Sequence, residues 1–253
     1  MSDLLRSEVL RLWSRRLVRV LAILAVLGIV AGVTIGTINS RPGHELQLFS
    51  LPDMLKGTAF ILIVIGLVIG ASSVGADWQT GGMSTILTWE PRRVRVLLGR
   101  TLVVVVSAFA LAVALQAVLS FAIAGGASLR GSTVETGGTW LRGVVGVILR
   151  IGGASALGAA FGLTLAMIGR NTSAALGASF AYLAIVESLL RSFIPKLGTA
   201  MLSTNVVVFV DGRTGSPGIG QTITVAHATL TMAIYAGVLL AAALAMFRAR
   251  DVT

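Results

Sequence analysis

Apolar residues fall in six long runs along this chain of 253 residues, with short polar stretches between them. None of the runs shows the strict alternation of a membrane strand, so each predicts a helix. Each also approaches the roughly 20 residues that a helix needs to cross about 30 Å of hydrocarbon. The expected spans are residues 17–37, 57–74, 101–124, 151–168, 172–190 and 226–247.

Composition supports a membrane protein. Hydrophobic residues make up 55% of the chain and charged residues 12%, whereas about a quarter of a soluble domain is charged. We therefore expect an all-α, polytopic membrane protein with one transmembrane domain over residues 17–253. The apolar run after Arg19 has no clear cleavage site, so we expect it to remain as a span. The chain has no cysteine, which excludes disulfides and thiolate metal sites.

The basic residues indicate an orientation. The net charge is +10, but the arginines lie at the ends of apolar runs and not along one face, so we expect no nucleic-acid partner. Six spans place both termini on one side, and that side then holds twelve of the 20 lysines and arginines. The excess is strongest around the first three spans, which predicts cytoplasmic termini and a cytoplasmic loop at residues 75–100.

The segment of residues 1–16 has two faces when it is drawn as a helix. Its apolar face consists of Leu5, Val9, Leu12 and Trp13, and its polar face of Asp3, Ser7, Arg11, Ser14 and Arg15. This pattern predicts an amphipathic helix in the membrane interface, with Trp13 among the headgroups and the arginines toward phosphates. The alternative is an ordinary juxtamembrane basic segment.

Glycines recur at helical spacing in three spans and predict close helix packing in the lipid, with a dimer interface as a second use of the same ridges. The three ridges are Gly28, Gly32 and Gly36, then Gly66 and Gly70, then Gly158 and Gly162. The outer segment of residues 191–225 contains the apolar stretch NVVVFV and the turn-rich stretch DGRTGSPGIG. We expect it to dip into the outer leaflet or to cover the mouth of the bundle, because NVVVFV is too short to span.

Candidate catalytic residues are scarce. The two histidines, His44 and His227, have no metal-ligand spacing, and neither Lys56 nor Lys196 follows the glycine pattern of a phosphate-binding loop. We expect no enzyme active site, no metal and no cofactor on this chain.

Three polar residues in or beside the spans are candidates for a pathway or a gate. Glu187 lies one turn from the outer end of its span, with Arg191 four residues later. An interfacial ion pair is the favoured interpretation, and a coupling carboxylate the alternative. Gln116 lies deep in the third span and could line a pathway or, more commonly, bond to a neighbouring helix. Arg150, before the fourth span, is expected to extend outward to water.

The loop DWQTGGMSTILTWEPRRVRVLLGR, residues 77–100, is the longest polar interruption in the first half of the chain. Met83, Ile86 and Leu87 have helical spacing, and Pro91 disfavours helix at Glu90. The pattern predicts a two-turn amphipathic helix that presents an apolar edge. Such a helix either docks a cytoplasmic partner or anchors the loop in the interface.

This loop resembles the membrane permease subunits of type-2 ATP-binding-cassette (ABC) exporters. The matching residues are Asp77, Trp78, Gly81, Gly82, Met83, Leu87, Pro91 and Arg100, and the step Pro91-Arg92-Arg93 is similar to that of actinobacterial members. Asp77 stands where the family usually has Glu, Gly82 where it has Thr, and Arg100 where it has Lys. The N-terminal helix, the six spans and the long last outer segment also fit that family.

The resemblance implies a type-2 ABC exporter permease fold in a bacterial plasma membrane, with transport of drugs, lipids or other substrates. Two permease copies, identical or related, would pair with two separate ATPase subunits that bind ATP and Mg²⁺. Gly82–Glu90 would be the coupling helix docked on an ATPase. The implied coupling residues are Asp77, Trp78, Gly81, Gly82, Met83, Ile86, Leu87, Glu90, Pro91, Arg92, Arg93 and Arg100. The alternatives are a non-transporting scaffold or immunity-like protein, and a secondary transporter centred on Glu187.

Overall fold

The computed structural model describes residues 2–38, 48–89, 92–130, 137–215 and 221–249. Within these ranges the protein is almost entirely helical and contains no strand, only an isolated antiparallel bridge between Gly215 and Ile223. Six helices of the described chain are long and apolar enough to cross a membrane. The expected all-α, multi-pass membrane protein is therefore confirmed at this level.

The spans correspond one to one with the six apolar runs. They are α2 (Arg16–Ile38), α4 (Ala59–Gln79), α6 (Arg93–Arg130), α7 (Gly138–Gly169), the unit Thr172–Phe193 and α11 (Val225–Ala249). The fifth unit consists of α8 (Thr172–Ala181), a π-helical turn (Tyr182–Val186) and α9 (Glu187–Phe193). The bounds of α4, α6 and α7 differ most from those expected from the sequence.

The bounds of the third and fourth spans were predicted too short. The α6 helix begins eight residues before residue 101, and α7 begins at Gly138 and not at residue 151. Arg142 and Arg150 interrupt the apolar run, but arginine is a good helix former, so the helix continues through both. Likewise α4 runs to Gln79, so the loop expected at residues 75–100 is reduced to the residues between Gln79 and Arg93.

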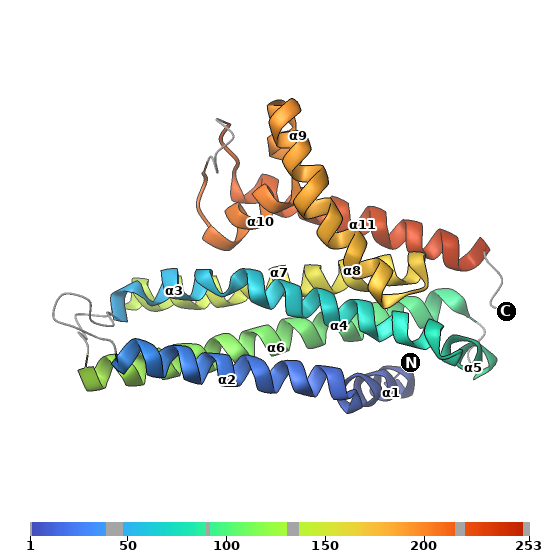
Figure 1. Ribbon diagram of the computed structural model, residues 1–253, viewed down its shortest axis with the longest axis horizontal. Helices are drawn as coiled ribbons and strands as arrows, with labels where there is room; N and C mark the ends of the chain where they lie inside the picture. Colours follow the sequence, from blue (N-terminus) through green and yellow to red (C-terminus); the bar gives the residue numbers. More distant parts are fainter. Residues whose placement is uncertain (1, 39–47, 90–91, 131–136, 216–220, 250–253) are drawn as a thin grey trace.

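Helices α2, α4, α6 and α7 lie along the long axis of the molecule (Figure 1). The fifth unit leaves this bundle at an angle, and α10 (Leu202–Asp211) and α11 lie over the same side of α7 (Figure 1). The short helix α3 (Leu51–Gly57) precedes α4. The most extensive packing in the molecule is that between α4 and α7.

Two of the three predicted glycine ridges meet across the α4–α7 seam. A Cβ added to Gly70 would overlap the carbonyl oxygen of Ala159, and one added to Gly162 would overlap that of Leu67. Gly66 and Gly158 face backbone carbonyls of the opposite helix in the same way. Backbone can approach backbone this closely only where no side chain intervenes, so the prediction of tight packing at these ridges is confirmed.

The third ridge behaves differently. A Cβ added to Gly28 or to Gly32 would meet no other atom within 4 Å, so these residues of α2 do not support close packing within the chain. Both residues instead line a cavity that is bounded by α2, α3, α4 and α6.

The segment after the fifth span forms short helices that fold back on the bundle. A 3-10 helix (Pro195–Ala200) leads into α10, and Asn205 of α10 donates from Nδ2 to the carbonyl oxygens of Thr199 and Met201. The α10 helix packs on α7 and α11. The expectation that this segment is not a further span holds for the described residues, while its depth in a leaflet stays a prediction.

Lys56 connects α3 to the last residue of α10. Its Nζ lies 3.0 Å from carboxylate oxygens of Asp53 and of Asp211. Burial lowers the pKa of Lys56, but the hydrogen bonds to Asp211 and Asp53 outweigh it, so the net pKa lies above the usual value. The ion pairs thus hold α10 beside the start of α4.

Candidate functional site at the α1 end of the bundle

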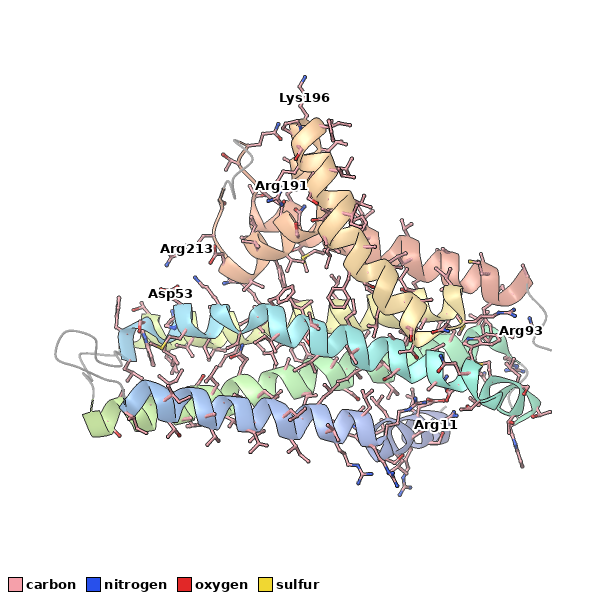
Figure 2. All side chains as sticks on the ribbon, in the orientation of Figure 1. Arg11, Asp53, Arg93, Arg191, Lys196 and Arg213 are labelled. Atoms are coloured by element: carbon pink, nitrogen blue, oxygen red, sulfur yellow. The ribbon has the colours of Figure 1, made fainter. Side chains whose placement is uncertain are left out.

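One end of the bundle gathers elements from across the sequence. Helix α1 (Ser2–Ser14), helix α5 (Gly82–Trp89), the start of α6, the turn between α7 and α8, and the end of α11 all lie there (Figure 1). We call this the α1 end. Arg11 and Arg93 mark it in Figure 2. The loop that the sequence singles out is part of it.

The predicted two-turn helix is present as α5. Gly81 has a φ of +71°, a left-handed conformation that suits glycine, and the chain reverses there between α4 and α5. The hydroxyl of Ser84 donates to the Gly81 carbonyl at 2.6 Å and closes the first turn. Glu90 and Pro91, which were expected to end the helix, lie outside the described residues.

The apolar edge of α5 faces the bundle, contrary to the expectation of an exposed edge. The side chain of Met83 is 1% exposed and belongs to the main core, and Leu87 packs against the same core. Burial of this edge offers more hydrophobic free energy than exposure at the membrane surface. The outward side of α5 is therefore its polar one, formed by Ser84, Thr85, Thr88 and Trp89.

Trp89 is the functional candidate that the sequence reasoning missed. Its side chain is 87% exposed, which is unusual for the largest aromatic side chain. A helical projection would have placed it away from Met83, on the polar face of an amphipathic helix. An exposed tryptophan there is typical of a binding anchor.

Asp77 and Arg100 form the centre of a buried ionic cluster. The Nη1 of Arg100 donates to Oδ2 of Asp77 at 2.7 Å, and Arg100 is 1% exposed. The same guanidinium donates from Nε and Nη2 to the two carboxylate oxygens of Glu8, at 3.2 and 3.1 Å. The two-pronged geometry is the one that arginine and carboxylate prefer. Helices α1, α4 and α6 are thus joined through one arginine.

Arg11 of α1 and Arg15, the residue between α1 and α2, complete this cluster, and their expected place was wrong. Arg15 donates to Oδ1 of Asp77 at 2.9 Å and Arg11 to the same oxygen at 3.2 Å. Arg15 also donates to the carbonyl oxygens of Ser72 and Ser73. The arginines therefore face a carboxylate and not lipid phosphates, because α1 packs against the bundle with its charged side inward.

Charge at the cluster is nearly balanced. Glu8 and Asp77 bring two negative charges, and Arg11, Arg15 and Arg100 bring three positive charges, which leaves a net charge of +1 by arithmetic. Buried charges persist only when they are paired and hydrogen-bonded. The two carboxylates accept five hydrogen bonds from the three arginines, and Arg11 adds an ion pair to Glu8 at 4.0 Å, so the ionic cluster meets this requirement.

Trp78 connects the cluster to the opposite side of the bundle. The guanidinium of Arg170 lies 4.6 Å from the centre of its ring, and its Nε1 donates to the sulfur of Met167 at 3.4 Å. Phe247, near the end of α11, packs edge-on at 6.3 Å. Arg93 donates to the carbonyl oxygen of Phe247 at 3.0 Å. The α1 end is therefore one packed unit that reaches from α1 to α11.

The implied coupling residues thus divide by position. Six of the twelve point into the protein: Asp77, Trp78, Met83, Leu87, Arg93 and Arg100. Ile86 is half-buried. A Cβ added to Gly82 would lie 3.6 Å from Nη2 of Arg11, which is an ordinary van der Waals contact. Arg92 is exposed and directly precedes α6. What sequence reasoning missed is the set of inward partners on other helices, namely Glu8, Arg11, Arg15 and Arg170.

Glu187 and Arg191 do not form the predicted ion pair. Glu187 is 2% exposed and accepts the backbone N–H of Ser203 at 3.1 Å, at the first turn of α10. Arg191 reaches the hydroxyls of Ser203 and Thr204 at 3.4 and 3.5 Å. A carboxylate satisfies the free N–H groups at a helix start, so Glu187 serves α10. This geometry gives a coupling carboxylate no particular support.

Arg150 does not extend outward as expected. Its guanidinium lies against Gly212, where an added Cβ would overlap it. Gly212 has a φ of +67° and ends α10. Because α7 continues through Arg150, this residue lies beside the end of α10, and its side chain packs against protein.

Among the described residues, no group of three or more His, Cys, Asp or Glu side chains could hold a metal ion. The contacts described above fix α1, α4, α6 and α11 relative to one another at the α1 end and leave one face of α5 outward.

The fold and this site define a multi-pass helical membrane protein with a structured loop at one end. A family model matches residues 18–253, and the chain belongs to that family, which is described as a protein of unknown function (DUF2705). No curated protein matches the chain.

Proposed function

We propose that the chain is the permease subunit of a type-2 ABC exporter in a bacterial plasma membrane. The observation that carries this proposal is α5. It is a short helix between two spans, it is seated on the bundle through Met83, and it presents Trp89 outward. A loop that only anchored itself in the interface would gain most by turning its apolar edge to the lipid.

The ionic cluster suggests how a force on α5 would reach the spans. Asp77 lies at the end of α4, and Arg100 at the start of α6, so the two helices that flank α5 are tied to each other and to α1. An ATPase that binds α5 differently in its open and closed states would bias the positions of all three helices together. Such differential contact is what shifts a conformational equilibrium.

Two ATPase subunits and a second permease copy complete the proposed assembly. ATP and Mg²⁺ belong to the ATPase, in keeping with the lack of a phosphate-binding loop pattern at Lys56 or Lys196. The α1 end would face the cytoplasm, since most of the basic residues flank it. Substrate export would use the six spans of both copies.

The test is co-purification with an ATPase encoded beside this chain. Trp89→Ala removes the exposed anchor without disturbing the core, so we expect association to weaken by about tenfold to 100-fold. The ATPase activity stimulated by the permease should fall with it. Phe193→Ala is the matched control, because Phe193 is 79% exposed but lies at the end of α9, away from α5.

The outcome separates the proposal from its alternatives. A chain that co-purifies no ATPase, or whose Trp89→Ala and Phe193→Ala variants behave alike, would favour a membrane scaffold. Transport that needs no ATPase and is lost in Glu187→Gln would instead favour a secondary transporter. Arg93 is a poor choice for this test, because its contact with Phe247 holds α11 in place.

A further inference from the structure

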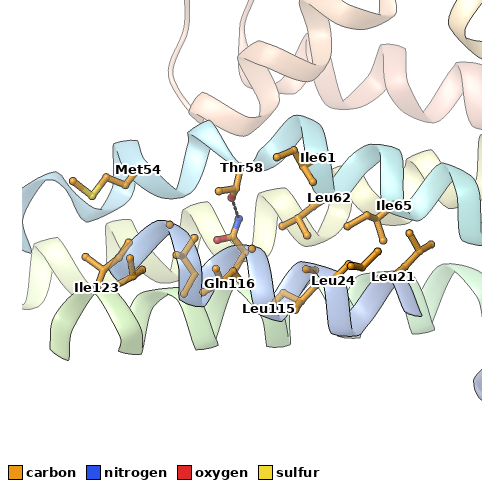
Figure 3. Close-up of a pocket in the computed structure, with 16 residues that line it drawn as sticks. Leu21, Leu24, Met54, Thr58, Ile61, Leu62, Ile65, Leu115, Gln116 and Ile123 are labelled. Carbon is orange, nitrogen blue, oxygen red and sulfur yellow. Dashed lines mark hydrogen bonds between the residues drawn. The ribbon is translucent and has the colours of Figure 1, made fainter. Parts of the chain in front are cut away.

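A cavity of about 600 Å³ separates α10 from the start of α4. The fifth unit, α7 and α11 complete its walls. Among the described residues, it shares no lining residue with the cavity beside Gly28 and Gly32 (Figure 3). Its walls are mostly apolar, and the charged residues among the described lining residues are Lys56 on the α3 side and Asp211 on the α10 side. The two charged side chains therefore come from opposite walls.

Lys56 and Asp211 meet where the cavity reaches the surface. The Nζ of Lys56 lies 3.0 Å from a carboxylate oxygen of Asp211, whose side chain is 52% exposed. Both side chains also line the cavity, so the pair has the cavity on one side and the outside on the other. Within the described chain, this pair is the one polar contact from the last turn of α10 to α3 or α4. It thus closes a mouth between the two walls.

Asp211 does not stabilise its own helix. It is the last residue of α10, and the carbonyl groups at that end of a helix carry a negative partial charge. A carboxylate is unfavourable there, whereas Asp53 lies in the first turn of α3, where a carboxylate is favourable. The position of Asp211 is therefore explained by its partner Lys56 and not by α10.

The start of α10 is held more firmly than its end. The backbone N–H of Ser203 donates to Glu187 at 3.1 Å, and the Tyr235 hydroxyl donates to the Ala200 carbonyl, just before α10, at 3.2 Å. At the other end, the guanidinium of Arg150 packs against Gly212 and makes no hydrogen bond or ion pair within the described chain. Loss of the Lys56 pair would therefore release the last turn of α10 before the first.

Asp53 provides Lys56 with a second partner. A carboxylate oxygen of Asp53, three residues earlier on α3, lies 3.0 Å from the same Nζ. A lysine that separates from Asp211 therefore keeps an acidic neighbour, and the separation leaves no unpaired cation. Exposed ion pairs contribute little free energy, so the arrangements with and without Asp211 lie close in free energy.

We propose that the pair of Lys56 and Asp211 is a latch on this cavity. When the latch is closed, it holds the end of α10 against α3 and keeps water-soluble molecules out. When it is open, Lys56 pairs with Asp53 alone, and molecules enter the cavity between α3 and α10. The latch lies within one chain and needs no ATPase, so its test is independent of the proposed transport function.

The test measures how fast a thiol inside the cavity is alkylated. The chain has no cysteine, so Ser179→Cys introduces a single thiol, at a residue that lines the cavity and is 6% exposed. Iodoacetamide is the probe, because it is small and uncharged and thus responds to access more than to local charge. Purified full-length protein in detergent micelles is treated with it, and mass spectrometry gives the rate of alkylation.

Lys56→Met removes the latch but keeps the length of the side chain. We expect the rate of alkylation at position 179 to rise by about twofold to fivefold, in line with the small contribution of an exposed ion pair. Reversal of both charges, in Lys56→Asp with Asp211→Lys, restores an ion pair between α3 and α10. It should return the rate to that of the protein with Ser179→Cys alone.

Asp53→Ala is the matched control. It also breaks an ion pair of Lys56, but it keeps the latch and removes the second partner, so the rate at position 179 should stay the same or fall. Ser73→Cys is a separate reporter of general loosening, because Ser73 is 4% exposed in α4 and does not line the cavity. Alkylation at position 73 should stay slow in every variant.

Four results would overturn the proposal. An unchanged rate in Lys56→Met would mean that the pair does not limit entry. A rise in Asp53→Ala equal to that in Lys56→Met would assign the effect to α3 alone. A rate that stays high after reversal of both charges would mean that pairing is not the cause. A parallel rise at position 73 would mean that the whole protein loosens.

Discussion

Asp77 is the residue on which three arginines converge, and it carries much of the order at the α1 end. Arg11, Arg15 and Arg100 all reach its carboxylate. Among the described residues, Glu8 is the other carboxylate that pairs with these arginines. A helical projection of residues 1–16 shows a polar face, but that face fits lipid phosphates as well as it fits a carboxylate about 60 residues later. The charged face of this segment is visible in the sequence, but its pairing with Asp77 depends on packing between distant parts of the chain.

Asp77→Ala tests how much this convergence contributes to stability. It leaves three arginines with Glu8 alone and raises the net charge of the cluster from +1 to +2. Removal of one partner from a buried ionic group typically costs about 3–5 kcal/mol. We expect the free energy of unfolding in mixed detergent micelles, followed by circular dichroism, to fall by that amount.

Asp53→Ala is the matched control for this change. Asp53 also pairs with a basic residue, but its side chain is 80% exposed. Exposed pairs contribute about 0–1 kcal/mol, so this variant should unfold nearly as the wild type does. Equal losses of stability in the two variants would contradict a special role for the ionic cluster.

Among the elements, α4 and α7 form the seam around which the bundle is built. Glycines on both helices bring backbone against backbone, and the sequence predicted these two ridges from spacing alone. The glycine spacing in α2 did not predict that this ridge would line a cavity, because the spacing is the same whether or not another helix packs on the ridge. Hydropathy also failed to predict the helix ends where a helix continues through arginines beyond its apolar run.

Gly70→Ala is the direct test of the seam. The added methyl group would overlap the Ala159 carbonyl, so the helices must separate. Overpacking of this kind costs about 1–3 kcal/mol or more. We expect that loss in the unfolding free energy, together with weaker resistance of the folded protein to detergent.

The same substitution in α2 provides the comparison. An added methyl group at Gly28 meets no atom within 4 Å, and alanine favours a helix by roughly 1 kcal/mol over glycine. Gly28→Ala should therefore leave stability unchanged or slightly higher. If Gly28→Ala lowered stability as much as Gly70→Ala, the effect would come from helix composition and not from the α4–α7 seam.

In the whole molecule, the ionic cluster joins α1, α4 and α6 at the end of the bundle where α5 lies. Composition and periodicity predicted the all-α membrane class and the six spans, since hydropathy and span length leave few other folds. They also predicted α5, because Gly81 and the spacing of Met83, Ile86 and Leu87 are local signals. The side of α5 that faces the bundle was predicted wrongly, since a lone amphipathic helix gives no information on what covers its apolar edge.

The proposed function depends above all on the docking of an ATPase on the outward face of α5. The most direct measurement replaces Trp89 with a photo-crosslinking amino acid in intact cells and identifies the captured protein by mass spectrometry of its peptides. We expect a covalent product with an ATPase that carries a phosphate-binding loop, which would also place the α1 end in the cytoplasm. The same substitution at Phe193 should give no such product. Capture of lipid alone at position 89, or the same ATPase product from both positions, would show that α5 does not dock an ATPase through this face.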